Sequence, residues 1–276
     1  MNNDKVKKSK RLTGERLFTV FIFGFLLTYA TFVMVILLAD VFYVELGELV
    51  KALLSSETFF AIKLSFITSI ISTFLAVLFA VPVAYALSRY EFPGKATIDT
   101  IIDLPMVLPP LIIGVSLLVF FSTSAGRFLE ARGFRLVYTV PGIVLAQFAI
   151  SSSFAVRAMK AAYDNIDVRY ELAARSLGCT KFQAFYKVII PLSRNGMIAG
   201  AVMTWARAVG EFVPILIFCG AMRFKTEILP TAIFLHLEMG DIQGSVALTI
   251  IMMVISLVAL LIFKKIGGTG KIARTK

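Results

Sequence analysis

The sequence has few of the side chains that build most enzyme and metal sites. Its 276 residues include 2 cysteines, 1 histidine and 1 tryptophan. Cys179 and Cys219 have no disulfide or metal-ligand spacing, and the acids are too scattered to form a cluster with His236. The chain also lacks the phosphate-binding loop GxxxxGK followed by Ser or Thr. We therefore predict no catalytic residue, no metal site and no cofactor on this chain, and no ATP hydrolysis by this chain alone.

Long apolar runs account for much of the remaining sequence. The chain is 58% hydrophobic with a mean hydropathy of +0.87, whereas soluble domains average about 45–50% apolar. The runs are about 20 residues long, which is the length of helix that crosses about 30 Å of hydrocarbon. Because a spanning segment must satisfy its own backbone hydrogen bonds, we predict an all-α membrane protein with six transmembrane helices. The predicted spans are 17–39, 59–87, 101–121, 138–156, 197–219 and 244–263.

The distribution of charge predicts the orientation. The net charge is +4 in residues 1–16, +4 in 157–196 and +5 in 264–276, whereas the three outer loops together carry −2. By the positive-inside rule both termini and the 157–196 loop are cytoplasmic, in a multi-pass protein of the plasma membrane. The predicted organisation is a basic tail (1–16), a six-helix domain (17–263) and a second basic tail (264–276). Because the positive charge is split among short juxtamembrane segments, no nucleic-acid partner is expected.

The stretch Tyr170–Leu192, YELAARSLGCTKFQAFYKVIIPL, is too polar to span a bilayer. Asp167 is placed to cap a helix whose apolar residues recur at helical spacing, and Gly178 is placed to end it. Thr180 and Gln183 have the spacing of a capping box for a second helix. The apolar residues predicted to share one face of that second helix are Phe182, Phe185 and Ile189.

Pro191 is predicted to block continuation of this second helix. The sequence thus predicts two short amphipathic helices with a kink at Gly178. Such a pair either presents an exposed apolar surface to a cytoplasmic partner or lies on the lipid surface. The residue pattern alone favours neither alternative.

The order of residues in this stretch resembles the cytoplasmic EAA loop of ABC-importer permeases. The motif of that loop is Glu-Ala-Ala, three residues, Gly, nine residues, Ile, one residue and Leu-Pro. In this chain LAARSLG ends at the Gly position, and nine residues later come Val188 and then Ile190-Pro191. The chain departs from the motif at its Glu position, where Leu172 stands with Glu171 one residue earlier. Ile190 also replaces the Leu before Pro.

This resemblance implies a type I ABC importer permease whose 167–191 loop docks into a separate ATPase subunit. The implied ATPase-coupling residues are Glu171, Leu172, Ala173, Ala174, Gly178, Phe182, Phe185 and Pro191. The implied partners are a second copy of this chain, two copies of the ATPase with its ATP and Mg²⁺, an extracytoplasmic oxyanion-binding protein and the lipid bilayer.

Three further stretches are similar to the molybdate, tungstate and sulfate permeases: VPVAYALSRYEFPGK (81–95), DLPMVLPPLIIG (103–114) and MTWARAVGEF (203–212). They imply molybdate or tungstate import, with sulfate or thiosulfate as the alternative. A transporter driven by an ion gradient is disfavoured because only Glu211 lies well inside a span and no inverted repeat is found. A membrane enzyme would need a nucleophile and a base, and no such constellation is found.

Prolines and one charge pair mark the candidate pathway. Pro109 and Pro110 are predicted to break or kink the third span. Together with Pro105 they either shape the pathway or mark a simple helix start with Pro105 in its first turn. Arg207 and Glu211, four residues apart in the fifth span, form either a structural ion pair or a gate and anion contact.

Small and polar residues mark helix contacts. Gly196 and Gly200 have GxxxG spacing, which fits a contact within one chain or a dimer interface. Gln147 and the serines at 151–153 form a polar stripe that either packs against helices or lines a pore.

Overall fold

All regular secondary structure in the described part of the chain is helical, which confirms the predicted all-α class. The computed structural model describes the backbone of residues 3–266 and the side chains of 16–263 and 265. The longer helices are α1 (Asn3–Tyr43), α3 (Ser56–Arg89), α7 (Val140–Asp164), α10 (Ile190–Val209) and α13 (Ile242–Ile266). The shorter ones are α2 (Leu46–Leu54), α4 (Lys95–Val107), α5 (Pro110–Ser122), α6 (Ser124–Ala131), α8 (Val168–Ser176), α9 (Lys181–Ala184), the π-helix η1 (Phe185–Ile189), α11 (Val213–Cys219) and α12 (Leu229–Glu238).

Four of these helices, α1, α3, α7 and α13, are long and apolar enough to cross a membrane singly. The predicted spans 101–121 and 197–219 are each interrupted. The bend is 109° between α4 and α5, and 56° between the continuous segment Lys181–Val209, which ends with α10, and α11. The predicted number of six spans is met when each bent pair is counted as one span.

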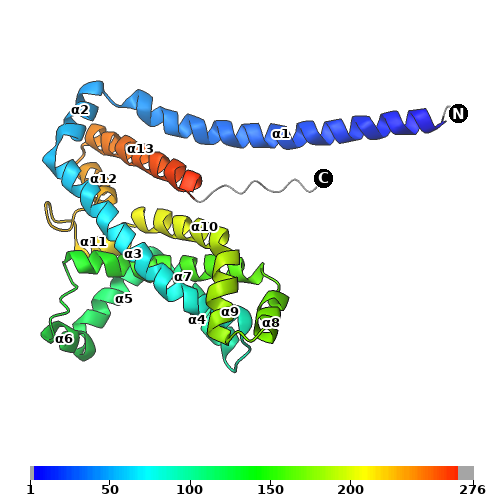
Figure 1. Ribbon diagram of the computed structural model, residues 1–276. Coiled ribbons are helices and arrows are strands. Elements are labelled where there is room, and N and C mark those ends of the chain that lie inside the picture. The colour runs from blue at the N-terminus through cyan, green and yellow to red at the C-terminus, as the bar shows by residue number, and fades with distance from the viewer. Residues whose placement is uncertain (1–2, 267–276) are drawn as a thin grey trace.

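The helix ends and the short helices gather at two opposite sides of the molecule (Figure 1). The N-terminal end of α1, the C-terminal end of α13, and α8 and α9 lie toward one side, and α2, α6 and α12 lie toward the other. Which side faces the cytoplasm stays a prediction from charge. The predicted tail 1–16 continues the first span as helix from Asn3 onward, and the tail 264–276 lies outside the described residues from 267 onward.

The core is built on close packing of α3, α7 and α10. Ala76, Ala80 and Ala84 follow one another at helical spacing on α3 and are fully buried. They share a cluster with Ala155 and Met159 of α7. Small residues allow helix backbones to approach closely where lipid supplies no hydrophobic driving force, so this stripe sets the α3–α7 contact.

The glycines of α10 make the same kind of contact. A Cβ placed on Gly196 would lie 2.8 Å from the Cβ of Ala162, and one on Gly200 would lie 2.6 Å from the Cβ of Ala158. The GxxxG spacing is therefore used within one chain, between α10 and α7.

The polar stripe of α7 also serves packing. Gln147, Ser151 and Ser153 are buried, and the hydroxyls of Ser151 and Ser72 are 3.5 Å apart. This places part of the stripe against α3.

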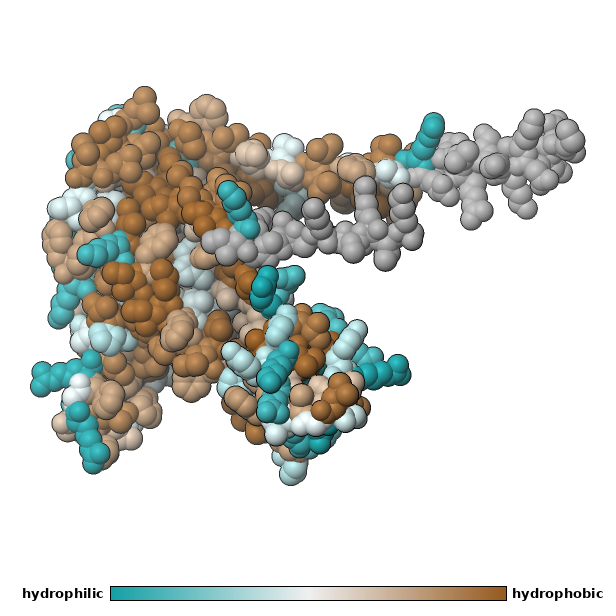
Figure 2. All heavy atoms as spheres, viewed as in Figure 1, coloured by the Kyte–Doolittle hydropathy of each residue, from teal (hydrophilic) through white to brown (hydrophobic). Residues whose placement is uncertain are grey.

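By contrast, α1 is almost unpacked against the rest of the chain. None of the residues in its most apolar window is buried, and Figure 2 shows hydrophobic residues over much of its surface. The helix contacts the bundle through α13. Such a surface requires an apolar environment, as expected for the first span of a membrane protein.

Candidate functional site

The polar stretch between α7 and α10 folds as a separate unit of α8 and α9, and its caps form as the sequence predicts. The carboxylate of Asp167 accepts a hydrogen bond of 2.9 Å from the backbone N–H of Arg169. Thr180 and Gln183 form a reciprocal capping box, with bonds of 3.2 Å and 2.9 Å. Each helix of the unit therefore begins at a residue that satisfies its own first N–H groups.

Gly178 lies between the two helices in the left-handed conformation, with φ of +92°. The backbone N–H of Gly178 donates to the carbonyl of Arg175 at 3.0 Å, and that of Cys179 donates to the carbonyl of Ala174 at 3.1 Å. These bonds satisfy carbonyls at the end of α8 and turn the chain into α9. The predicted kink at Gly178 is confirmed.

One side of this unit faces the bundle. Ala174, Ala184 and Ile189 are buried, and the ring of Phe185 lies 4.4 Å from that of Tyr85 on α3. Because α8 contacts η1, and η1 continues into α10, the unit is joined to the spanning helices by packing as well as by the chain.

The unit also carries large apolar side chains that are mostly exposed. They are between 52% and 86% exposed, and we call them the apolar patch: Tyr170, Leu172, Leu177, Phe182 and Tyr186. Phe182 is exposed, whereas Phe185 is half-buried and Ile189 is buried, so these three residues at helical spacing differ in burial. The buried stripe of α9 and η1 is narrow. It consists of Ala184 and Ile189, Phe185 at its edge is half-buried, and Phe182 is exposed.

Glu171 is buried, although it was expected at the partner-facing surface. Its carboxylate accepts a hydrogen bond of 2.7 Å from the hydroxyl of Tyr85, and lies 3.7 Å from the guanidinium of Arg89. In the structure it anchors α8 to the end of α3, and the neighbouring Leu172 is the one that faces outward.

Arg89 extends the anchor to a third helix. Its guanidinium donates to the backbone carbonyls of Tyr163 at 2.9 Å and Ile166 at 2.8 Å, at the end of α7. A cation at a helix C-terminus stabilises both the free carbonyls and the helix dipole. Sequence reasoning missed Tyr85 and Arg89, although their spacing of four residues near the end of a span places them on one helix face.

Pro191 does not end the second helix as predicted. The chain continues from α9 through η1 into α10, with Pro191 in the first turn of α10. The backbone N–H of Ile190 donates to the carbonyl of Phe185, five residues back. This wider turn accommodates a proline that has no N–H and whose ring crowds the carbonyl four residues earlier.

Pro109 and Pro110 break the third span as predicted, whereas Pro105 lies inside α4. α4 contains Pro105 and ends at Val107, Pro109 is the N-terminal cap of α5, and Pro110 is its first residue. α5 then packs on α11, where a Cβ on Gly114 would lie 2.8 Å from the backbone of Pro214. The two broken spans thus meet at their second halves.

Arg207 and Glu211 form the predicted ion pair, with 2.5 Å between nitrogen and oxygen. The carboxylate is buried at the α10–α11 break, whereas Arg207 is partly exposed and lies over the ring of Phe154. Asp103 of α4 pairs with Arg157 of α7, which was not predicted.

A sequence profile of the family described as "Binding-protein-dependent transport system inner membrane component" matches residues 74–267. The chain belongs to this family. The matched range includes both broken spans, the 167–191 unit and α13.

Relatives of the permease have been named for different oxyanions. The chain is 36% identical over 200 residues to the molybdenum transport system permease protein ModB of Escherichia coli K12, covering 68% of this chain and 86% of ModB. It is 31% identical over 202 residues to the sulfate transport system permease protein CysT of Salmonella typhimurium, covering 72% and 73%. It is 32% identical over 206 residues to the molybdate/tungstate permease protein WtpB of Thermococcus kodakarensis, covering 74% and 79%.

Solved structures show the same fold. A bacterial alginate ABC transporter, in complex with an alginate pentasaccharide-bound periplasmic protein, contains a chain that matches with a TM-score of 0.70 at 20% identity. The match covers 97% of this permease and 98% of that chain. The predicted fold of a type I ABC importer permease is therefore confirmed.

Proposed function

We propose that this permease is the membrane-spanning subunit of an ATP-driven importer for molybdate or tungstate. The observation that carries the proposal is the α8–α9 unit. One side is anchored to α3 through Glu171, with Arg89 bonding the end of α7, and the other exposes the apolar patch. An aqueous surface of this kind fits a protein groove, because aromatic and leucine side chains gain free energy when a partner removes them from water.

The partner at the patch is an ATPase subunit that carries ATP and Mg²⁺, in two copies beneath a homodimer of this chain. Closure of the ATPases pushes on the α8–α9 units, and the anchor passes the movement to α3 and α7. The pathway then alternates between outward and inward access. The permease itself hydrolyses nothing, because its sequence has no phosphate-binding loop.

The residues proposed for the pathway are Pro105, Pro109, Pro110, Arg207 and Glu211. They lie at the two broken spans, and broken helices in transporters favour polar contacts with a substrate. Arg207 is already paired with Glu211, so we assign the pair to the gate and not to direct coordination of the anion.

An extracytoplasmic oxyanion-binding protein delivers the anion. Molybdate or tungstate is favoured by the identity of 36% to ModB, and sulfate or thiosulfate is the second candidate because CysT is 31% identical. Tetrahedral dianions differ little in charge and shape, so selection by the binding protein explains how related permeases serve different anions.

Co-purification tests the class of transporter. The tagged chain is expressed with candidate ATPase and binding-protein subunits, extracted in mild detergent, and its stoichiometry is read by native mass spectrometry. A complex of two permeases and two ATPases is expected, and a permease that stays alone beside a folded ATPase would contradict the proposal.

Uptake then identifies the anion. Proteoliposomes containing the complex and ATP are supplied with molybdate, tungstate or sulfate, and the imported molybdenum, tungsten or sulfur is measured by mass spectrometry. ATP-dependent uptake of sulfate alone would reassign the substrate and leave the class intact.

A further inference from the structure

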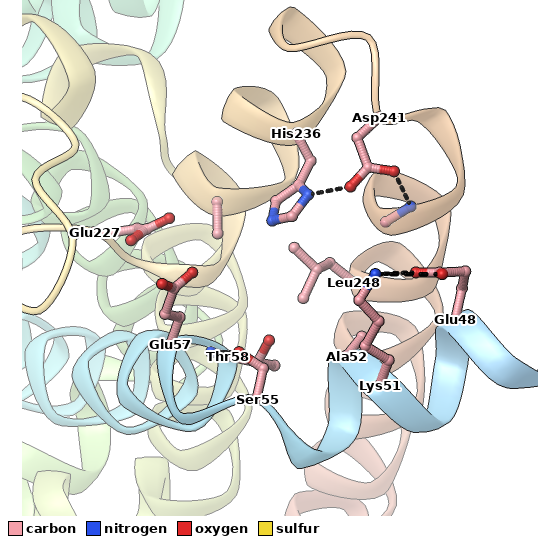
Figure 3. A pocket seen from close by; sticks show the side chains of 12 residues that line it. Glu48, Lys51, Ala52, Ser55, Glu57, Thr58, Glu227, His236, Asp241 and Leu248 are labelled. Carbon is pink, nitrogen blue, oxygen red and sulfur yellow. Dashed lines mark hydrogen bonds and ion pairs between the residues drawn. The ribbon is translucent and has the colours of Figure 1, made fainter.

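A small cavity with acidic walls lies at the end of the bundle opposite α8 and α9 (Figures 1 and 3). Its volume is about 170 Å³, and it is enclosed by α2, the start of α3, α12 and the start of α13. Four carboxylates line it, from α2, α3 and the segments just before α12 and α13: Glu48, Glu57, Glu227 and Asp241.

Three of the four carboxylates have a side-chain partner. The partners are Lys51 at 3.2 Å from Glu48, Arg223 at 3.1 Å from Glu57 and His236 at 2.7 Å from Asp241. Glu227 is the exception: the residue is only 4% exposed, and its carboxylate has no hydrogen bond or ion pair to another described residue, although its oxygens are not completely enclosed. Figure 3 shows the carboxylates of Glu227 and Glu57 turned toward the same part of the cavity.

Partial burial without a partner makes the charged form of this carboxylate less favourable, and a cation that enters the cavity would offset that effect. Burial raises the pKa of the Glu227 carboxyl above its ordinary value, and the nearby Arg223 only partly opposes this shift. Besides the four carboxylates, the lining contains one lysine and one histidine, so the cavity is negative overall when His236 is neutral. Its chemistry therefore selects a positively charged group.

The walls indicate which kind of cation fits. The described residues contain no group of three His, Cys, Asp or Glu side chains arranged to hold a metal ion. The lining does contain apolar residues beside the acids, namely Ala52, Ala232 and Leu248. Lysine and arginine match such a mixed surface, because their aliphatic stems lie on apolar groups while the charged head reaches a carboxylate.

Access to the cavity is open from its rim. The side chains of Lys51, Glu57 and Asp241 are all more than a third exposed, so a side chain from another protein can reach Glu227 between them. We propose that the cavity receives a lysine or arginine side chain of the extracytoplasmic binding protein, with Glu227 as its acceptor. The identity of this partner rests on the proposed function, since the cavity lies at the end expected to face outward.

Cysteine reactivity tests the cation preference without any partner. Ala52→Cys is placed in the cavity in a chain that also carries Cys179→Ser and Cys219→Ala. Its modification rates by a cationic and an anionic methanethiosulfonate reagent are compared in detergent. We expect a cation preference of about tenfold, because clefts lined by one sign of charge concentrate the opposite ion.

Glu227→Gln should reduce the preference, and Glu238→Gln, an exposed acid outside the cavity, should leave it unchanged. Equal rates, or no effect of Glu227→Gln, would overturn the proposal.

Protection tests the partner. The binding protein that co-purifies with the importer is added in excess, and modification of Ala52→Cys by the cationic reagent is followed. Protection that is lost in Glu227→Gln is expected. A strong cation preference without protection would overturn the docking role, while co-purification of the ATPase would still uphold the proposed function.

Discussion

The hydroxyl of Tyr85 on α3 donates a hydrogen bond of 2.7 Å to the buried carboxylate of Glu171 on α8. This contact joins a membrane-spanning helix to the unit that carries the apolar patch. Arg89, one turn further along α3, adds its guanidinium 3.7 Å from the same carboxylate and bonds the end of α7. These contacts join α8 to two spanning helices through side chains as well as through the backbone.

Tyr85→Phe is expected to weaken this anchor without removing the apolar contacts of the ring. The variant leaves a buried carboxylate oxygen without its donor, which costs about 1–3 kcal/mol of stability. We expect a lower midpoint of thermal unfolding in detergent and, in the assembled importer, less transport per ATP hydrolysed. Tyr90→Phe removes a hydroxyl from an exposed neighbouring tyrosine and is the matched control. If both variants behave alike, the Tyr85–Glu171 contact does not couple the helices.

Gly178→Ala is expected to strain the turn between α8 and α9. A Cβ at φ of +92° meets no neighbouring atom, so the effect comes from the backbone conformation, at about 1–2 kcal/mol. The expected result is reduced ATPase co-purification with an intact transmembrane bundle, checked by size-exclusion chromatography. Gly47→Ala, in α2 and equally uncrowded, should assemble normally. Normal assembly of Gly178→Ala would show that the kink is not needed for docking.

Gly200→Ala is expected to destabilise the bundle itself. Its Cβ would lie 2.6 Å from the Cβ of Ala158, so α10 and α7 must move apart. Overpacking of this kind costs about 1–3 kcal/mol and should lower the thermal midpoint. Gly24→Ala on the exposed face of α1 meets no atom within 4 Å and serves as the control. An unchanged midpoint in Gly200→Ala would contradict the close α7–α10 contact.

Asp241 is expected to make stability depend on pH. The backbone N–H of Gly244 and then His236 hold the pKa of the Asp241 carboxyl below its ordinary value. The folded protein therefore binds this proton less tightly than the unfolded chain, so the stabilisation is fully present above the ordinary aspartate pKa and is lost as the pH falls from there through the lowered pKa of the folded protein. Thermal midpoints measured from acid to neutral pH should rise more steeply for the wild type than for Asp241→Asn. Parallel curves would contradict this assignment.

Much of the fold follows from local patterns in the sequence. Apolar runs, Asp167, the Thr180–Gln183 pair, Gly178 and the Pro109–Pro110 break each act through neighbouring residues, so each is predictable from spacing. The α8–α9 unit was recognised for this reason.

The rest depends on contacts between distant parts of the chain. Glu171 meets Tyr85 across 86 residues, so its inward direction cannot be read from the motif around it. The narrow buried stripe that separates Phe182 from Phe185 follows from the same packing. Pro191 was misjudged because a π turn absorbs a proline that would break an ordinary α-helix.

The most direct test of the account is the stoichiometry of ATPase binding when the apolar patch is charged. Leu177 is the most exposed member of the patch, at 86%, and Leu177→Asp should leave the fold unchanged while preventing burial against a partner. Phe134→Asp places the same charge on an exposed apolar residue in the loop after α6 and is the control. Native mass spectrometry should show the ATPase bound to the wild type and to Phe134→Asp, and absent from Leu177→Asp. Full ATPase binding by Leu177→Asp, together with normal uptake, would contradict the claim that the patch is the coupling surface.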